Sequence, residues 1–265
     1  MTTVARYELS AADVTRYRED GFLPGPYYLC SPEEMAGIRD RIEREVLSTD
    51  PPFANVIPED EVRRGSTRTQ WRHLDKHIVY DLCAQPSIVG RMASLYGPDL
   101  VLWRSLFFVK NPGGPASPWH QDWKSWPMLD PKITVTAWIA ITEATLENSC
   151  MQLIPGSHTV MVPHIGETDA NAADFTHPEP AAVETSRAVP VELKPGEFFL
   201  LDERVLHYAA PIPPDSNRRR IGLAVRVTVP SVKVDHAQCF PGHKVIVISG
   251  EDHYGLNETT QPPAD

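Results

Sequence analysis

Patterns typical of helices lie before residue 99 of this chain, and short strand patterns fill most of the chain beyond it. The later segments are rich in β-branched and aromatic residues and are separated by Pro, Gly and Asn turn signals. They are DLVLWRSLFFVK, PWHQDW, KITVTAWIAIT, CMQLIP, VPVELKPGEFFLLD, RRIGLAVRVTVP and HKVIVISG. Helices do not alternate with these strands, which disfavours a parallel α/β fold. We therefore predict a mainly β protein with flanking helices, folded as a double-stranded β-helix (a jelly roll of the cupin type).

Three helical segments precede the strands. Ser10 opens the first with a capping-box pattern, and Ser31 is the expected N-cap of the second, with Glu34 at its third position. Residues 77–96 form the third segment, with an interruption near Pro86. These helices are expected to pack on one face of the β structure.

The length of 265 residues and a hydrophobic content of 42% are sufficient for one large core. No internal repeat or domain-separating linker is evident, so 1–265 is interpreted as a single domain. Its helical layer would span about 8–98 and its jelly-roll core about 99–250. Residues 160–188 are interpreted as a long loop, and the tail 259–265 as a loose end.

Charge and cysteine usage restrict the class of partner. The net charge of −10 and the absence of a basic cluster argue against nucleic acid and anionic membranes. The four cysteines are widely spaced, and neither a signal peptide nor a membrane span is apparent. We expect a cytoplasmic protein, monomeric or homodimeric, that acts on a small molecule.

The segment SPWHQDWKSWP carries a His and an Asp two residues apart. On a strand, His120 and Asp122 would share one face, while Trp119 and Trp123 would share the other. One imidazole and one carboxylate need a third ligand to form a facial triad for non-heme Fe(II). His207 is the best candidate, because it follows a buried strand and precedes a basic one. The other histidines are weaker candidates: His73, His77, His158, His164, His177, His236, His243 and His253.

The basic strand supplies a possible anion site. A 2-oxo acid bound to iron in a buried site would need a cation, and the planar fork of Arg matches a carboxylate. The odd positions after Arg219 are apolar and should pack on the helices. Arg219, a charge at the start of this face, is therefore assigned to the surface. Arg218 and Arg220 on the even face remain alternatives. We favour Arg220, which is deeper in the strand and lies next to the small Gly222.

These motifs resemble the phytanoyl-CoA dioxygenase-like branch of the Fe(II)/2-oxoglutarate oxygenases. The resemblance covers nearly the whole chain and is carried by DGFLPG, WHQDW, TAWIAITEATLENSCMQLIPGSH, HYAAPIPPDSNRRRIGLAVR and SGEDHYGL. It implies Fe(II), 2-oxoglutarate and O2, with three iron ligands: His120, Asp122 and His207. It also implies that Arg220 binds the distal carboxylate of 2-oxoglutarate and that Trp138 faces this cosubstrate.

Two departures from the family pattern are visible. A small hydroxyl residue is frequent two positions after the distal His, where this chain has Ala209. The usual Asn-Gly is Asn148-Ser149, which affects the expected turn geometry.

The resemblance implies oxidative decarboxylation of 2-oxoglutarate to succinate and CO2, coupled to oxidation of a small molecule, in secondary metabolism. Halogenating relatives replace the carboxylate ligand, so the retained Asp122 predicts a hydroxylase (or a desaturating, cyclising or epimerising enzyme) and not a halogenase. The alternative is a non-redox cupin-type metal-binding protein or isomerase. Candidate substrate contacts are Trp103, Ser105, Trp123 and Arg72.

Overall fold

The computed structural model describes residues 7–56, 68–162 and 183–264. Most of the predicted loop at 160–188 therefore lies outside the described residues. The α-helices are α1 (Ala11–Asp20), α2 (Pro32–Arg41), α4 (His77–Cys83), α5 (Pro86–Tyr96) and α6 (His236–Cys239). A π-helical turn, Ile42–Leu47, extends α2.

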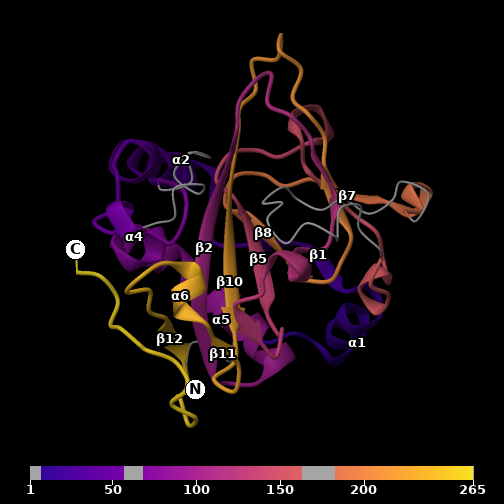
Figure 1. The fold of residues 1–265 in the computed structure, drawn as a ribbon. Coiled ribbons are helices and arrows are strands. Elements are labelled where there is room, and N and C mark those ends of the chain that lie inside the picture. The colour runs from indigo at the N-terminus through magenta and orange to yellow at the C-terminus, as the bar shows by residue number, and fades with distance from the viewer. Residues whose placement is uncertain (1–6, 57–67, 163–182, 265) are drawn as a thin grey trace, which may run out of the picture.

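The strands form two main sheets with antiparallel pairing and a small third sheet (Figure 1). The six-stranded sheet has the order β1-β8-β5-β10-β2-β12, and the four-stranded sheet has the order β3-β9-β6-β7. β11 (Lys233–Val234) pairs with β4 (Leu129–Asp130). The strands of the large sheet are β1 (Phe22–Tyr28), β8 (Glu197–Asp202), β5 (Val135–Ala140), β10 (Arg220–Thr228), β2 (Leu100–Lys110) and β12 (Ile246–Ser249). Those of the smaller sheet are β3 (Ser117–His120), β9 (His207–Ala209), β6 (Met151–Leu153) and β7 (Val189–Val191). The predicted jelly-roll fold is confirmed.

The predicted helix signals are confirmed. Ser10 and Ser31 each accept a hydrogen bond from the third helical backbone N–H, and the acidic residue at that position reaches back to the cap. Pro86 begins α5 and thereby separates it from α4. The local chemistry of the chain therefore sets where these helices begin.

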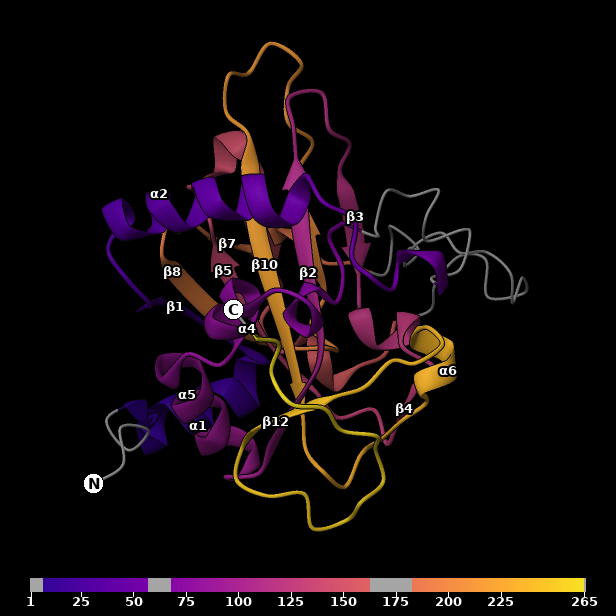
Figure 2. The ribbon, with the colours of Figure 1, turned by 90° about the vertical axis from the view of Figure 1, so that its left-hand side faces the viewer.

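Helices α2, α4 and α5 cover one face of the large sheet (Figure 2). The odd residues of β10, from Ile221 to Val227, belong to the buried cluster that also contains Met35 of α2 and Met92 of α5. Ala224, on the even side, belongs to the cluster between the two sheets. The predicted alternation of β10 is therefore confirmed: its odd residues face the helices, and its even residues face the space between the two sheets.

Three parts of the prediction differ from the structure. The HQDW segment does not continue as a strand, because β3 ends at His120 and a 3-10 turn, Asp122–Ser125, follows. The predicted helical layer contains β1, an edge strand of the large sheet. The tail is held in place: the backbone N–H of Thr260 donates to Val245 (2.9 Å), and His77 Nδ1 lies 2.8 Å from the carbonyl oxygen of Pro263.

Within the described ranges, no helix has both the length and the apolar character needed to cross a membrane. The cytoplasmic location and the oligomeric state stay predictions.

Two buried histidines make the stability of the fold dependent on pH. Burial lowers the pKa of His73 and of His243 from 6.5 to about 3, and a neighbouring histidine adds to each shift. As the pH falls below 6.5, the unfolded chain binds protons first, so stability is lost between about 6.5 and 3. At pH 5 each histidine should account for a loss of about 2 kcal/mol. We expect urea unfolding to show a smaller loss between pH 7.5 and 5 in His243→Gln than in the wild type.

His253→Gln is the matched control, because this side chain is 61% exposed. Its loss of stability over the same pH interval should equal that of the wild type. An unchanged pH dependence in His243→Gln would contradict the assignment.

Candidate metal centre

His120 and His207 face each other across two strands. They are directly paired in the β3–β9 register, and their ring centroids lie 4.0 Å apart. His120 Nδ1 lies 2.7 Å from the carbonyl oxygen of Pro118, and His207 Nδ1 lies 2.9 Å from that of Val205. A carbonyl oxygen only accepts, so each Nδ1 must carry the proton. The Nε2 lone pair of each neutral ring is therefore available as a ligand.

Asp122 lies beside this pair at the start of the 3-10 turn. Its Oδ1 is 3.6 Å from His120 Nε2, and its Oδ2 accepts a hydrogen bond from Nη2 of Arg226 at 3.0 Å. Burial alone would raise the pKa of Asp122, but Arg226 and the two imidazoles hold it well below its usual range. The carboxylate is therefore charged at neutral pH.

Together these three side chains have the chemistry of a metal site. One ligand atom from each lies within 4.8 Å of the others, and all three residues are buried. Burial, with His120 adding to it, lowers the pKa of His207 to about 4, so this imidazole is neutral at neutral pH. Two imidazoles and one carboxylate suit a divalent transition metal and leave further coordination positions open.

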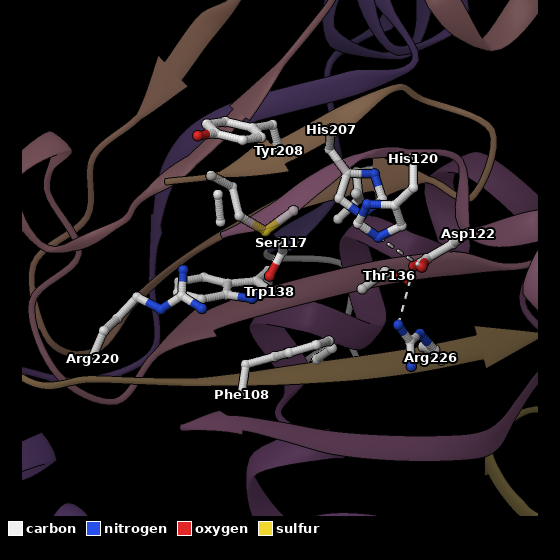
Figure 3. A pocket seen from close by; sticks show the side chains of 14 residues that line it. Phe108, Ser117, His120, Asp122, Thr136, Trp138, His207, Tyr208, Arg220 and Arg226 are labelled. Atoms are coloured by element: carbon white, nitrogen blue, oxygen red, sulfur yellow. Dashed lines mark hydrogen bonds and ion pairs between the residues drawn. The ribbon is translucent and has the colours of Figure 1, made fainter. Parts of the chain in front are cut away.

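The other end of the same cavity holds Arg220. Figure 3 shows Arg220 and Trp138 opposite the His–Asp–His group. Burial lowers the pKa of Arg220 to about 10, which leaves it charged at neutral pH. Its Nη1 donates to the carbonyl oxygen of Ser149, its Nε is buried without a partner, and its guanidinium lies 5.3 Å from the Trp138 ring centroid. A buried cation with an unused donor fits an anionic group in this cavity.

The neighbouring arginines lie elsewhere. Arg218 is 46% exposed and pairs with Glu147, and Arg219 forms a surface ion pair with Glu43. Arg218 does not line the cavity. Burial and position thus favour Arg220 over Arg218, in line with the greater depth of Arg220 in the strand.

Gly222 makes room for a side chain and not for a ligand. A Cβ at this position would lie 2.0 Å from Cζ2 of Trp138, which leans over the glycine from the neighbouring strand. We expect Gly222→Ala to displace this indole and to lower the free energy of unfolding by about 1–3 kcal/mol, measured by urea titration.

Gly37→Ala is the matched control for Gly222→Ala. Its added Cβ would meet nothing within 4 Å, and it lies inside α2. It should stabilise the protein by about 0.5–1 kcal/mol. Equal effects of the two substitutions would contradict the steric argument.

Both departures from the family pattern have a structural counterpart. Ala209 lines the cavity, and Ser117, its direct partner across β3 and β9, lines it too and carries a hydroxyl. Ser149 adopts the left-handed conformation (φ 77°) that favours glycine. Its hydroxyl accepts from Lys110 at 2.9 Å and donates to the carbonyl oxygen of Ala210. These bonds hold the turn in a conformation that is unusual for serine.

Trp103 and Ser105 do not line the cavity. A bulge in the β2–β10 pairing lies between them, because Val227 pairs with Leu102 but Arg226 pairs with Arg104. The bulge shifts the alternation by one residue, so the two side chains point to opposite sides of the sheet. Trp103 packs against Trp126, and Ser105 Oγ lies 2.8 Å from His73 Nδ1. Their prediction as substrate contacts is wrong for this cavity.

Trp123 and Arg72 also lie outside the cavity lining. Trp123 is half-buried, with Lys132 Nζ 4.5 Å from its ring centroid. Arg72 is fully buried and donates to the carbonyl oxygens of Val46 (2.6 Å) and Thr49 (2.8 Å). It anchors the end of the helical layer, so its prediction as a substrate contact is wrong for this cavity.

Several residues of the site were not predicted. Arg226 and Thr136 share the alternation phase of Arg220 and Trp138, so period two could have indicated both. Phe108 lines the cavity from the position opposite Gly222 on β2. Gln121 holds the turn after β3, because its amide donates to the carbonyl oxygen of Arg204 (2.6 Å) and to two others. No local sequence signal indicates that contact. Of the weaker histidine candidates, His164 and His177 lie outside the described residues.

Comparison with known proteins places this site in a family. The family model described as phytanoyl-CoA dioxygenase (PhyH) matches residues 17–221. The chain belongs to this family. Dioxygenase lolE1 of Epichloe uncinata is a similar family relative, 26% identical over 231 residues, which are 80% of this chain and 81% of that protein. The family resemblance predicted from the motifs is therefore confirmed.

Further similarities extend to an ectoine dioxygenase and to a solved structure. The ectoine dioxygenase of Nocardia farcinica is 29% identical over 62% of this chain, and the match spans 56% of that protein. The structure described as CytC3 with Fe(II) and alpha-ketoglutarate superimposes with a TM-score of 0.72, at 26% identity, and covers 97% of this chain and 95% of that one. Both similarities favour the oxygenase interpretation over the non-redox cupin alternative.

Proposed function

We propose that this protein is an Fe(II)- and 2-oxoglutarate-dependent oxygenase that hydroxylates a small molecule of secondary metabolism. The observation that carries the proposal is one buried cavity with a His–Asp–His group at one end and a buried arginine at the other. His120, Asp122 and His207 would hold the metal, and Arg220 would hold the distal carboxylate of the cosubstrate. Family membership and the likeness to CytC3, whose structure contains both groups, support this assignment.

The chain's own residues would prepare the site for these groups. The backbone carbonyls of Pro118 and Val205 keep the protons on Nδ1, so that both Nε2 atoms remain available. The apolar walls keep water away from the ion pair between Arg220 and a carboxylate, which strengthens it. Bound Fe(II) and 2-oxoglutarate would supply the activation of O2 and the oxidation of a substrate C–H bond.

The hydroxyl of Ser117 would take the role left open by Ala209. It lines the cavity next to Ala209, its partner on the neighbouring strand, and is seen in Figure 3 beside Trp138. A hydroxyl there can donate to a carboxylate held by Arg220. The retained Asp122 supports hydroxylation, or a related oxidation, over halogenation, since it leaves no ligand position for a halide in its place.

Anaerobic titration tests the proposal directly. Fe(II) and 2-oxoglutarate together should produce a visible charge-transfer band, whereas either one alone should not. Aerobic incubation with a library of uncharged and charged small molecules should then identify substrates by succinate release. Absence of the band, together with absence of succinate for every compound, would favour the non-redox cupin alternative.

A further inference from the structure

Arg226 is a buried cation in contact with the Asp122 carboxylate. Its side chain is 4% exposed, and Nη2 donates to Oδ2 at 3.0 Å. The other oxygen, Oδ1, lies toward the imidazoles, 3.6 Å from His120 Nε2 (Figure 3). The two carboxylate oxygens of Asp122 therefore have different partners.

Arg226 is itself held by a stack of tryptophans. Its guanidinium lies 4.5 Å from the ring centroid of Trp126, and Trp126 packs edge-on against Trp103 at 5.3 Å. Nε1 of Trp103 donates to Oγ1 of Thr134 at 3.1 Å, which fixes the far end of the stack. The position over the face of the Trp126 indole restricts the guanidinium to few orientations.

Trp126 and Asp122 belong to the same short turn. Asp122 begins the 3-10 turn, and Trp126 is the residue that ends it. Arg226, from β10, thus contacts both ends of the turn. This arrangement limits rotation of the Asp122 carboxylate about its side-chain bonds.

We propose that Arg226 is a positioning residue that keeps Oδ2 of Asp122 away from the metal, so that the carboxylate binds through one oxygen only. This inference rests on the proposed function. A carboxylate can bind a metal through one oxygen or through both. An Asp122 free to turn would place its second oxygen in a position that 2-oxoglutarate needs, and the cosubstrate would have to displace it.

The proposal predicts opposite effects on the metal and on the cosubstrate. Loss of a ligand's partner usually weakens metal binding, but loss of Arg226 also removes a like charge close to the cation. Metal affinity should therefore change little or increase. Affinity for 2-oxoglutarate in the metal-loaded protein should fall by at least about 10-fold, because the cosubstrate would first have to displace the second oxygen of Asp122. An ion pair with a purely structural role would change stability and leave the cosubstrate affinity of the folded protein unaltered.

Arg226→Met is the main test, with Arg104→Met as the matched control. Arg104 is paired directly with Arg226 on β2 and also lies over a tryptophan, 5.1 Å from the Trp71 ring. Its Nη2 donates to Oε1 of Gln70, whereas Asp122 pairs with Arg226. Arg104→Met also removes one positive charge near the site. Any loss of 2-oxoglutarate affinity in this variant therefore measures the general effect of losing a positive charge. The measurements are Fe(II) affinity, 2-oxoglutarate affinity from the charge-transfer band, and urea unfolding, all without O2.

We expect Arg226→Met to weaken 2-oxoglutarate binding by at least about 10-fold more than Arg104→Met does, without weaker metal binding. Arg226→Lys, which keeps the charge but loses the planar stack, should fall between Arg226→Met and the wild type. Equal 2-oxoglutarate affinities in Arg226→Met and Arg104→Met would overturn the proposal. If Arg226→Met does not fold, Trp126→Leu takes its place as the test. Trp126→Leu should weaken 2-oxoglutarate binding severalfold. Wild-type affinity for 2-oxoglutarate in Trp126→Leu would then overturn the proposal. A wild-type protein without the band would contradict the proposed function itself.

Discussion

Replacing His207 by alanine should abolish succinate formation and weaken Fe(II) binding by more than about 100-fold. Changing a mere partner of a metal ligand costs about 10- to 100-fold in affinity, so loss of a ligand should cost more. His207 is neutral and its only described hydrogen bond is to the Val205 carbonyl, so no buried charge is left unpaired. The variant should therefore fold. Metal titration monitored by calorimetry under nitrogen measures the effect, and circular dichroism checks the fold.

His253→Ala is the control for this substitution, because His253 is exposed. It should bind Fe(II) like the wild type. Asp122→Ala should also abolish hydroxylation, but it leaves Arg226 buried without its carboxylate, which costs about 3–5 kcal/mol of stability. Full activity in either His207→Ala or Asp122→Ala would contradict the ligand assignment.

Replacing Arg220 by leucine should raise the 2-oxoglutarate dissociation constant roughly 30- to 1,000-fold, which corresponds to about 2–4 kcal/mol. The buried carboxylate of the cosubstrate would lose its only cation at that end of the described cavity lining. Fe(II) affinity should change little, since Arg220 lies at the other end of the cavity from the metal ligands (Figure 3). Titration of the charge-transfer band with 2-oxoglutarate measures the change.

Arg218→Leu is a matched control for Arg220→Leu. It removes the same charge two residues away, from an exposed side chain paired with Glu147. Its 2-oxoglutarate affinity should remain within about 2-fold of the wild type, as expected for a screened surface charge. A larger effect in Arg218→Leu than in Arg220→Leu would reverse the assignment.

Much of this site can be predicted from alternation along single strands. Ile221, Leu223 and Val225 face the helices, and this leaves Arg220 on the side of the cavity. The same argument applied to Arg226 would have placed it in the site, since it shares the phase of Arg220. The alternation of side chains along one strand does not depend on which strands lie beside it, so it can be predicted from the sequence.

The predictions from the sequence fail where the backbone departs from the two-residue alternation of a regular strand. The bulge in β2 separates Trp103 from Ser105 in phase, and nothing in LVLWRSLFFVK marks it. HQDW alternates as a strand would, yet the chain turns after His120. Gln121 accounts for part of this, because its buried amide binds backbone groups far along the chain.

The sequence by itself determined the helix starts, the period of β10, the family and the three residues of the candidate metal group. These follow from local chemistry and from motifs, which need only neighbouring residues. Only the tertiary structure decided that Arg226 holds Asp122, that Trp138 fills the space over Gly222 and that Arg72 is an anchor. Each of these joins residues that are distant in the chain or on different strands. Contacts of that kind depend on strand register and on burial, which emerge only when the sheets pack together.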